Sequence, residues 1–233
     1  MKKSSYKEYL AALSKIGKAI TSDLYLEDIL KLIVTLSANV MHAKICSLWL
    51  VDEKEQALRI RATQAMSEEY LKERKLMVGE GIVGLVAKEK KPIVIRDVLK
   101  DSRYKEKTLA KKEKLTSMLS VPMMVKNRVI GVVNCYTTTS YEFSESDIDL
   151  LTAVANQAAV AIENTELMVK TKIVQEELEA RKKIEKAKGI LMKQKGLTEE
   201  QAYELLRKAS MNKRLTMKDV AEAIILSHEI KGT

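Results

Sequence analysis

The stretch "IEKAKGILMKQKGLTEEQAYELLRKASMNKRLTMKDVAEAII", residues 184–225, decides how the C-terminal part of the chain folds. Gly196 follows a run with helical periodicity, in the place of the residue that comes directly after a helix end. Residues 198–201, "TEEQ", form a capping box that opens a second helix, and Thr216 with Asp219 opens a third. We therefore expect three helices, the first much longer than the others.

Gly189 interrupts the first of these helices between Lys188 and an Ile-Leu-Met run. A glycine inside a helix costs about 1 kcal/mol relative to alanine, so the position needs a reason. Either another backbone or a ligand comes close to it, or the third helix packs tightly on the first. The residue types alone favour neither explanation.

The positive charge of the chain is concentrated in this region. Residues 181–218 hold twelve Lys or Arg and four Glu, a net charge of +8, whereas the whole chain of 233 residues carries +9. Such a block is typical of a surface that binds nucleic acid or another polyanion. The alternative is a solvated lysine-rich surface without a partner.

A long helix precedes the basic block. Ser144 is a candidate N-cap with Asp147 three residues on, and neither Pro nor Gly occurs from there to Lys188. Apolar or small residues recur at steps of 4, 3, 4, 3 and 4, which is a heptad seam; they are Leu151, Ala155, Ala158, Ile162, Thr165 and Val169. We expect one linking helix over residues 144–190 that forms a coiled-coil homodimer through residues 144–180. A helix that packs back on its own domain is the alternative.

The part of the chain before Ser144 alternates short strands and helices, which indicates a mixed α+β domain. Two amphipathic helices are predicted first, over residues 5–20 and 25–41, and then two strands over 43–52 and 57–64. A Gly-rich turn, a short helix near residues 82–89 and another strand follow. Residues 116–138 are predicted to form two more strands around a turn at 126–128.

The motif Ala-Lys-Gly-Ile-Leu-Met at 187–192, with its basic and Gly continuation, resembles the ANTAR domain over residues 175–230. The resemblance implies a dimeric RNA-binding module that binds tandem stem-loops in leader transcripts and prevents formation of a terminator hairpin. Tyr203, the single tyrosine of this part, is expected in the core. The residues expected to contact RNA are Lys186, Lys188, Gly189, Lys193, Lys195, Arg207, Lys213 and Arg214, with Lys188, Lys195 and Arg214 foremost.

Residues 8–165, with the segment "GEGIVGLVAKEKKPIVIRDV", resemble a GAF domain, a family of sensor domains. The resemblance implies either a pocket for a small ligand or a ligand-free dimerisation domain. His42 is expected to have a surface or packing role, no metal-binding cluster is visible, and the sequence identifies no cofactor. The expected pocket residues are Cys46, Gly79, Gly81, Gly84, Val94, Ser120 and Cys135.

Together these features predict a signal-responsive transcription antitermination regulator rather than an enzyme. No apolar run is long enough to span a membrane and the N-terminus does not resemble a signal peptide, so we expect a cytoplasmic protein. A GAF-regulated DNA-binding transcription factor is an alternative, because a basic three-helix tail can resemble a helix-turn-helix. A cysteine-dependent GAF methionine sulfoxide reductase is less favoured, because the chain has two cysteines and no cluster of three.

Overall fold

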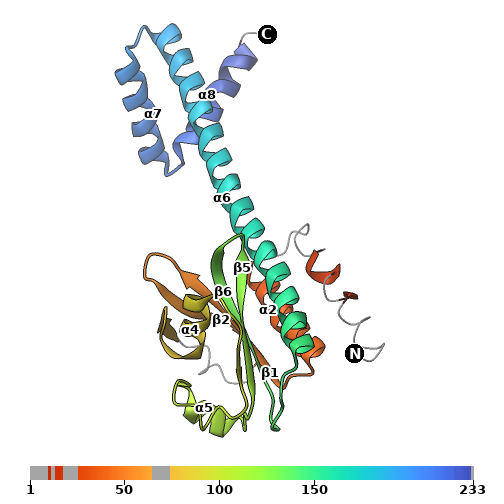
Figure 1. The fold of residues 1–233 in the computed structure, drawn as a ribbon. Coiled ribbons are helices and arrows are strands. Elements are labelled where there is room, and N and C mark those ends of the chain that lie inside the picture. The colour runs from red at the N-terminus through yellow and green to blue at the C-terminus, as the bar shows by residue number, and fades with distance from the viewer. Residues whose placement is uncertain (1–9, 12–13, 18–25, 65–73, 232–233) are drawn as a thin grey trace. The chain divides into compact units, whose positions relative to one another are not determined.

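The computed structural model describes residues 10–11, 14–17, 26–64 and 74–231 (Figure 1). The chain divides into an N-terminal unit, residues 1–166, and a C-terminal unit, residues 167–233. One helix of 51 residues, α6 (Glu145–Lys195), contributes to both units. No described helix combines the length and the apolar character that crossing a bilayer requires.

The described part of the N-terminal unit is built on a six-stranded sheet with the order β3-β2-β1-β6-β5-β4, in which every neighbouring pair is antiparallel. The strands are β1 (Ile45–Asp52), β2 (Ala57–Thr63), β3 (Lys75–Met77), β4 (Ile93–Ile95), β5 (Met118–Val125) and β6 (Arg128–Tyr136). The helices of this unit besides α6 are α2 (Leu26–Met41), α4 (Gly81–Glu89) and α5 (Lys107–Lys112). The predicted α+β class is confirmed.

Each face of the sheet has its own hydrophobic core. Because successive side chains of a strand point to opposite faces, Leu48 packs with α2 and α6, whereas Trp49 packs with α4 and α5. Val133 and Val132 on β6 divide in the same way. The two layers of helices therefore cover the two faces, as Figure 1 shows.

Most predicted elements of this unit are confirmed, with small differences at their ends. The helix expected at 25–41 is α2, and the helix expected near 82–89 is α4. Helix α5 and the three-residue strand β3 were not predicted, because both are too short to show a period. Of the helix expected at 5–20, residues 10–11 and 14–17 are helical and the rest lies outside the described residues.

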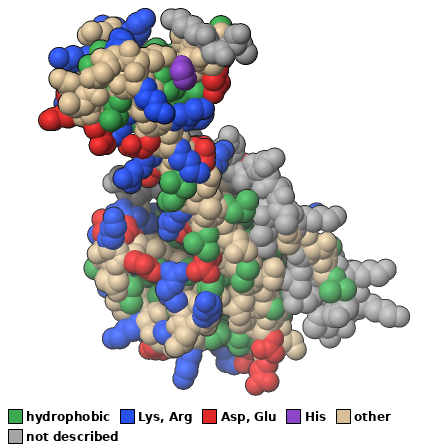
Figure 2. All heavy atoms as spheres, turned by 90° about the horizontal axis from the view of Figure 1, so that it is seen from above, with side chains coloured by type: hydrophobic (Ala, Val, Ile, Leu, Met, Phe, Trp, Pro, Cys, Tyr) green, Lys and Arg blue, Asp and Glu red, His purple; other side chains and the backbone are tan. Residues whose placement is uncertain are grey.

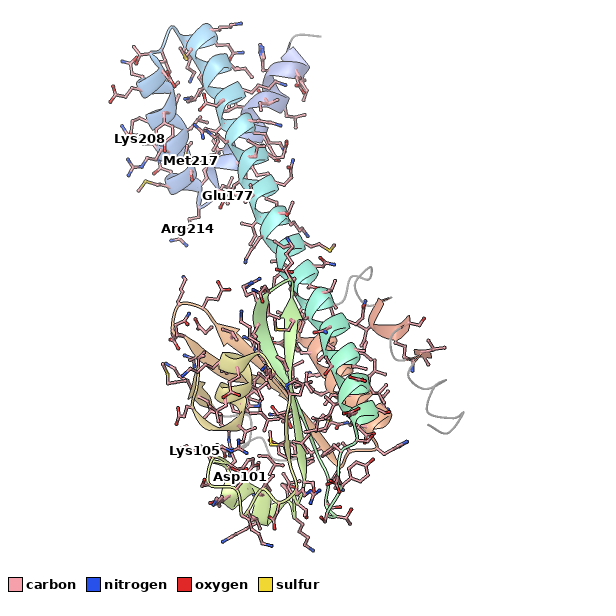
Figure 3. The ribbon with its side chains drawn as sticks, viewed as in Figure 1. Asp101, Lys105, Glu177, Lys208, Arg214 and Met217 are labelled. Atoms are coloured by element: carbon pink, nitrogen blue, oxygen red, sulfur yellow. The ribbon has the colours of Figure 1, made fainter. Side chains whose placement is uncertain are left out.

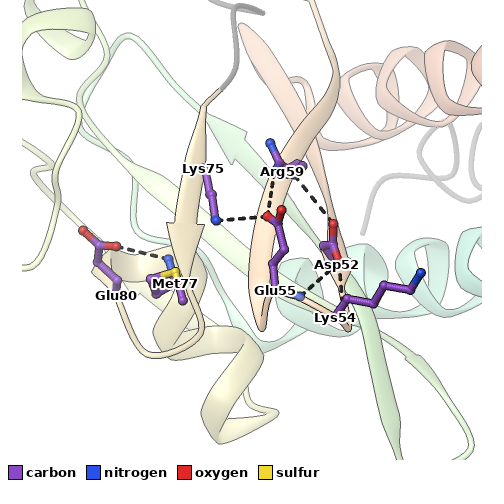
Figure 4. Close-up of polar contacts among 7 residues, drawn as sticks. All are labelled: Asp52, Lys54, Glu55, Arg59, Lys75, Met77 and Glu80. Atoms are coloured by element: carbon purple, nitrogen blue, oxygen red, sulfur yellow. Dashed lines mark hydrogen bonds and ion pairs between the residues drawn. The ribbon is translucent and has the colours of Figure 1, made fainter.

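Polar contacts fix the hairpin between β1 and β2 (Figure 4). The carboxylate of Asp52 accepts hydrogen bonds from the backbone N–H groups of Lys54 and Glu55, at 3.1 and 3.2 Å. Glu55 pairs with Lys75 of β3 at 2.9 Å and with Arg59 of β2 at 2.6 Å, and these two cations lower the pKa of its carboxyl group. These contacts connect three neighbouring strands at one end of the sheet.

The first part of α6 packs on its own sheet. Ser144 and Asp147 cap the helix reciprocally, as predicted, with Ser144 N–H donating to Asp147 at 2.8 Å. Four residues of the predicted dimer seam are at most 1% exposed and belong to the core with α2; they are Leu151, Ala155, Ala158 and Ile162. The expectation that these four contact a second copy is wrong, because a heptad spacing fits packing on a sheet as well as pairing with a helix.

The C-terminal unit contains the end of α6, α7 (Glu199–Lys213) and α8 (Met217–Lys231). Gly196 has a φ of +64°, Thr198 and Gln201 form the full capping box, and Thr216 and Asp219 cap α8. The three predicted helices are confirmed. Their core consists of the buried residues Ala187, Leu191, Ala202, Leu206, Val220 and Ala221.

Candidate nucleic-acid interface

Lys188 is enclosed in the C-terminal unit. Its side chain is 9% exposed, and its Nζ lies 2.6 Å from a carboxylate oxygen of Glu199 and 3.0 Å from one of Glu185. Both carboxylates raise the pKa of the Lys188 ammonium group, with Glu199 contributing most. Since Glu199 begins α7, this pair connects α6 to the first turn of α7. One of the three foremost expected RNA contacts is thus occupied by an internal ion pair.

Gly189 has the opposite environment from its neighbour. A Cβ atom built at this position has no neighbouring heavy atom within 4 Å, apart from the backbone of its own helix. The explanation that α8 packs tightly on α6 at this glycine is therefore wrong. The open backbone leaves room for a molecule from outside the chain.

Two further basic residues of α6 are paired with α8. Lys183 lies 2.6 Å from Glu222, and Lys186 lies 2.9 Å from Glu229. Their side chains are 38% and 58% exposed, so Lys186 in particular can still reach solvent. These contacts are exposed ion pairs, which typically contribute up to about 1 kcal/mol each.

The remaining expected RNA contacts divide between the two ends of α7. Lys193 and Lys195 lie at the end of α6, directly before α7, and Lys213 and Arg214 lie where α7 ends. None of these four forms an ion pair with another residue in the described part of the chain. A helix of 15 residues separates the two groups by about 20 Å along its axis. The structure does not bring all expected residues into one patch. Figure 2 likewise shows basic side chains in several groups with acidic ones between them.

Arg207 and Tyr203 lie on α7 between these two groups. The guanidinium group of Arg207 is 3.3 Å from Glu204, in an exposed pair. Tyr203 is 43% exposed, so its expected place in the core is wrong. The sequence contained the signal, because Ala202 and Leu206 define the core face of α7 and Tyr203 lies outside the spacing of that face.

The seven expected pocket residues of the N-terminal unit lie on both sides of its sheet. Cys46, Cys135 and Val94 pack with the core under α2 and α6. Ser120 points to the other face, where α4 lies. The structure therefore does not bring the cysteines together with the glycines of α4, because residues on opposite faces of a sheet cannot line one pocket.

The three glycines of the expected pocket shape the start of α4. Gly79 and Gly81 have φ values of +92° and +63°, which favour glycine. A Cβ on Gly84 would lie 2.3 Å from the carbonyl oxygen of Met77, so the helix can approach β3 only with glycine there. These glycines have a structural role whether or not a ligand binds.

A buried polar ladder crosses the three central strands on the α4 side of the sheet. Ser47, Asn134 and Ser120 are adjacent in the register of β1, β6 and β5, and all are fully buried. Ser120 donates to Asn134 at 2.7 Å, and Asn134 donates to Ser47 at 3.2 Å. Of these three residues the sequence pointed to Ser120 alone. Single polar residues inside strands carry no signal until the register makes them neighbours.

Two of the surface hollows formed by the described residues of this unit have volumes of about 530 and 500 Å³, and none of the seven expected pocket residues lines either of them. One of about 530 Å³ lies between the α2–β1 connection and the start of α6, beside His42 and Asp147. The other, of about 500 Å³, lies at the opposite ends of the strands, beside Lys90 and Arg128. The expected surface or packing role of His42 is consistent with its place at a hollow rim.

The cysteines do not form a reactive site of the kind that a reductase needs. Cys46 and Cys135 are directly opposite each other on β1 and β6, fully buried, with their sulfur atoms 2.6 Å apart. Burial, assisted by the neighbouring thiol, raises the pKa of Cys46 well above its usual value, which disfavours the nucleophilic thiolate. Among the described residues, no three His, Cys, Asp or Glu side chains gather as a metal site would require.

Comparison with known proteins agrees with this architecture. The transcriptional regulatory protein PdtaR of Mycobacterium tuberculosis is 29% identical over 185 residues, which cover 76% of this chain and 88% of PdtaR. An Escherichia coli protein described as "Phosphoenolpyruvate-dependent phosphotransferase system" is 27% identical over 158 residues, 68% of this chain. The matched region is 21% of that protein, so the chain spans about a fifth of its length.

A solved structure and two family models give the assignment. The GAF domain from an Acinetobacter phosphoenolpyruvate-protein phosphotransferase superposes with a TM-score of 0.59 at 26% identity, and covers 70% of this chain and 97% of its own. Residues 24–163 match the model of the GAF domain, and residues 173–225 match that of the ANTAR domain. The chain therefore belongs to the GAF-domain family, and its GAF domain is followed by a C-terminal ANTAR domain.

Proposed function

We propose that this protein is a signal-responsive regulator of transcription antitermination, which binds tandem stem-loop RNA in leader transcripts and prevents terminator formation. The observation that carries the proposal is the match of residues 173–225 to the ANTAR domain. The name of the similar protein PdtaR, a transcriptional regulatory protein, supports the same class. Nascent transcripts are made in the cytoplasm, which is where we place the protein.

RNA contact falls to the cations that have no internal acidic partner in the described residues. Lys193 and Lys195 at one end of α7, and Lys213 and Arg214 at the other, are free to bind phosphates. Phosphate contacts supply affinity and position, whereas loop bases supply specificity. Gly189 allows close approach of RNA because nothing in its own unit fills the space beside it. Lys188 holds α7 in place instead.

Pairing of two copies through α6 is the second part of the proposal. All six large apolar side chains between residues 167 and 178 are 46–63% exposed, an unusual density for a monomer surface. Leu167, Thr171, Val174 and Leu178 recur at steps of 4, 3 and 4, which is a heptad seam. A dimer would present two RNA-binding units to the two stem-loops of one transcript, and the second contact then benefits from the first.

The GAF domain supplies the signal in this proposal, by binding a small ligand. The face of the sheet under α4 is the better candidate site, because it holds the polar ladder of Ser47, Asn134 and Ser120 in an otherwise apolar layer. Small-molecule sites combine an apolar lining with a few polar groups in this way. A GAF domain that serves dimerisation alone is the alternative.

The direct test is a binding titration of the full chain with an RNA that contains two stem-loops, against duplex DNA of equal length and charge. We expect the RNA to bind more tightly, and its affinity to fall steeply with salt because phosphate contacts release counterions. Transcription in vitro through a leader with the stem-loops and a terminator should then show more readthrough when the protein is added. Preference for duplex DNA, or equal readthrough with and without protein, would contradict the proposal and favour the DNA-binding alternative.

A further inference from the structure

Tyr203 presents an aromatic ring at the surface of the C-terminal unit. It lies on α7 next to Ala202, which is fully buried, yet its own side chain is 43% exposed. No described residue forms a hydrogen bond with its hydroxyl group. An aromatic ring that contributes little to the core of its unit is free to contact a partner.

One arginine lies on the same flank of α7 as this ring, and a second lies directly after the helix ends. A step of four residues along a helix returns to within about 40° of the starting direction, and this step leads from Tyr203 to Arg207. Arg214 is the first residue after α7. The guanidinium group of Arg207 is 58% exposed and contacts Glu204 at 3.3 Å, a weak surface pair that a ligand can replace. We call Tyr203, Arg207 and Arg214 the Tyr203 stripe.

Arg214 occupies a backbone position that usually holds glycine. It is the C-cap residue directly after α7, with a φ of +56°, and the N–H of Leu215 bonds back to the carbonyl of Ser210 at 3.1 Å. A side chain with a Cβ in this conformation costs about 1 kcal/mol, which a glycine would avoid. Figure 3 shows Arg214 at the turn after α7, directed away from the helices. Its guanidinium group has no acidic partner in the described residues, so it is available to a ligand.

The combination of an exposed ring with two exposed guanidinium groups matches the chemistry of an unpaired base beside its phosphates. Aromatic rings and Arg planes stack on bases that are splayed out of a loop, and Arg also binds the flanking phosphates. Tyr and Arg are also enriched at protein interfaces, but the net charge of +8 over residues 181–218 favours a polyanionic partner. We infer that the Tyr203 stripe binds a loop nucleotide of the RNA, with the ring of Tyr203 stacked on the base. This inference rests on the proposed RNA-binding function and names the residues that recognise the loop.

The test is a double-mutant cycle between Tyr203→Ala and an RNA whose loop nucleotides are abasic. Against intact RNA, Tyr203→Ala should weaken binding roughly 5- to 150-fold, the range typical of one stacked base. Against the abasic RNA, the same substitution should have no effect, because the stacking partner is gone. Tyr203→Phe should retain the affinity of the wild type, since it keeps the ring. Leu205→Ala is the matched control, because Leu205 is 36% exposed on the other flank of the same helix.

The salt dependence of RNA affinity distinguishes the contribution of the Tyr203 ring from that of the arginines. Arg214→Ala should reduce the slope of log affinity against log salt by about 1, whereas Tyr203→Ala should leave this slope unchanged. In a Tyr203→Trp variant, bound RNA should protect the new indole from acrylamide quenching, and Trp49 contributes little to the signal because it is 2% exposed.

Failure of the inference and failure of the proposed function give different results. If wild type binds the intact RNA and Tyr203→Ala binds it equally well, the inference is overturned and RNA binding stands. Equal losses for Tyr203→Ala on intact and abasic RNA would also overturn it, because the ring would then act without the base. If wild type binds no stem-loop RNA, the proposed function itself fails. Circular dichroism checks folding, and alanine at position 203 should keep the helix because it favours helices.

Discussion

Single residues in the C-terminal unit show how neighbours in the sequence take opposite roles. Lys188 points towards α7 and is held between two glutamates, whereas Gly189 lies one position further around the helix and faces open space. A rotation of 100° per residue is enough to move a side chain from the interior of the unit to its surface. The motif Ala-Lys-Gly therefore combines one internal contact with one open position.

Gly189→Ala should stabilise the C-terminal unit by about 1 kcal/mol, because alanine favours the helix and its methyl group meets nothing. Gly196→Ala is the matched control, since Gly196 is also in open space but has a φ of +64°. That control should destabilise by about 1 kcal/mol. Urea unfolding followed by circular dichroism measures both. A destabilising Gly189→Ala would mean that the glycine serves the fold. Stabilisation together with weaker RNA binding would support close approach of RNA.

The ion pair between Lys188 and Glu199 should make the stability of the fold depend on pH in the acid range. Lys188 lowers the pKa of the Glu199 carboxyl group in the folded state, so the pair adds stability above the unfolded pKa of about 4.3. That stability is lost as the pH falls through the folded pKa. Between pH 7 and pH 3, Glu199→Gln should therefore lose less stability than wild type does. Glu200→Gln, the next residue and not ion-paired within the described structure, should behave as wild type. Equal losses in all three proteins would show that the pair does not stabilise the fold.

At the scale of elements, α6 uses different faces along its length. Its first part buries Leu151, Ala155, Ala158 and Ile162 against the sheet of the N-terminal unit. Beyond residue 166 its large apolar side chains are exposed as far as Leu178, and Ile184, Ala187 and Leu191 then pack in the core of the C-terminal unit. The exposed segment is the part of the helix that has no partner within the described residues.

Ile162→Ala should destabilise the N-terminal unit by about 2–5 kcal/mol, because Ile162 is 1% exposed and a cavity would remain. Ile173→Ala, the same substitution at a residue that is 50% exposed, should change stability by no more than about 0.5 kcal/mol. Chemical denaturation followed by the fluorescence of the buried Trp49 measures the effect on the sheet. Similar values for the two variants would contradict the packing of α6 on the sheet.

At the scale of the whole molecule, we propose that two copies of the chain form a dimer through α6. Leu167 and Val174 lie on the proposed seam, whereas Val169 and Ile173 lie on another side of the helix. Each of these two follows a seam residue by two positions, which corresponds to a rotation of about 200° around the helix axis. The side chains of all four residues are 50–63% exposed. They therefore differ in position around α6 and not in burial.

Leu167→Glu combined with Val174→Glu should convert the dimer into a monomer of 26.3 kDa, because the seam would bring four like charges together. The matched control, Val169→Glu with Ile173→Glu, should remain a dimer. Light scattering measures the mass, and the monomer should also lose the gain in affinity that a second stem-loop gives. If the control becomes monomeric and the seam variant does not, dimerisation uses the face that includes Val169, as the heptad from Leu151 to Val169 predicts.

Ligand binding to the GAF domain is tested on the full chain by a thermal-shift screen of small metabolites. A ligand that binds under α4 should raise the melting temperature of the wild type. The shift should be lost in Ser120→Ala, which removes the hydroxyl group of one member of the polar ladder at nearly the same volume. Ser117→Ala is a control, because Ser117 is equally buried but bonds to the carbonyl of Arg96. A shift that survives Ser120→Ala would place the ligand away from the polar ladder.

Local interactions specify the elements of the C-terminal unit and their order, because helix caps and residues in the left-handed conformation at helix ends depend on neighbouring residues only. The capping box at Thr198, the glycine at 196 and the Thr216–Asp219 cap each involve residues within three or four positions. Which apolar and charged residues are internal depends instead on contacts between elements. The heptad from Leu151 is the same pattern whether a sheet or a second helix covers it, and Lys188 resembles its neighbours until Glu199 is placed beside it. Such contacts join residues that are distant in the chain or on different helices, so their partners exist only once the fold has formed.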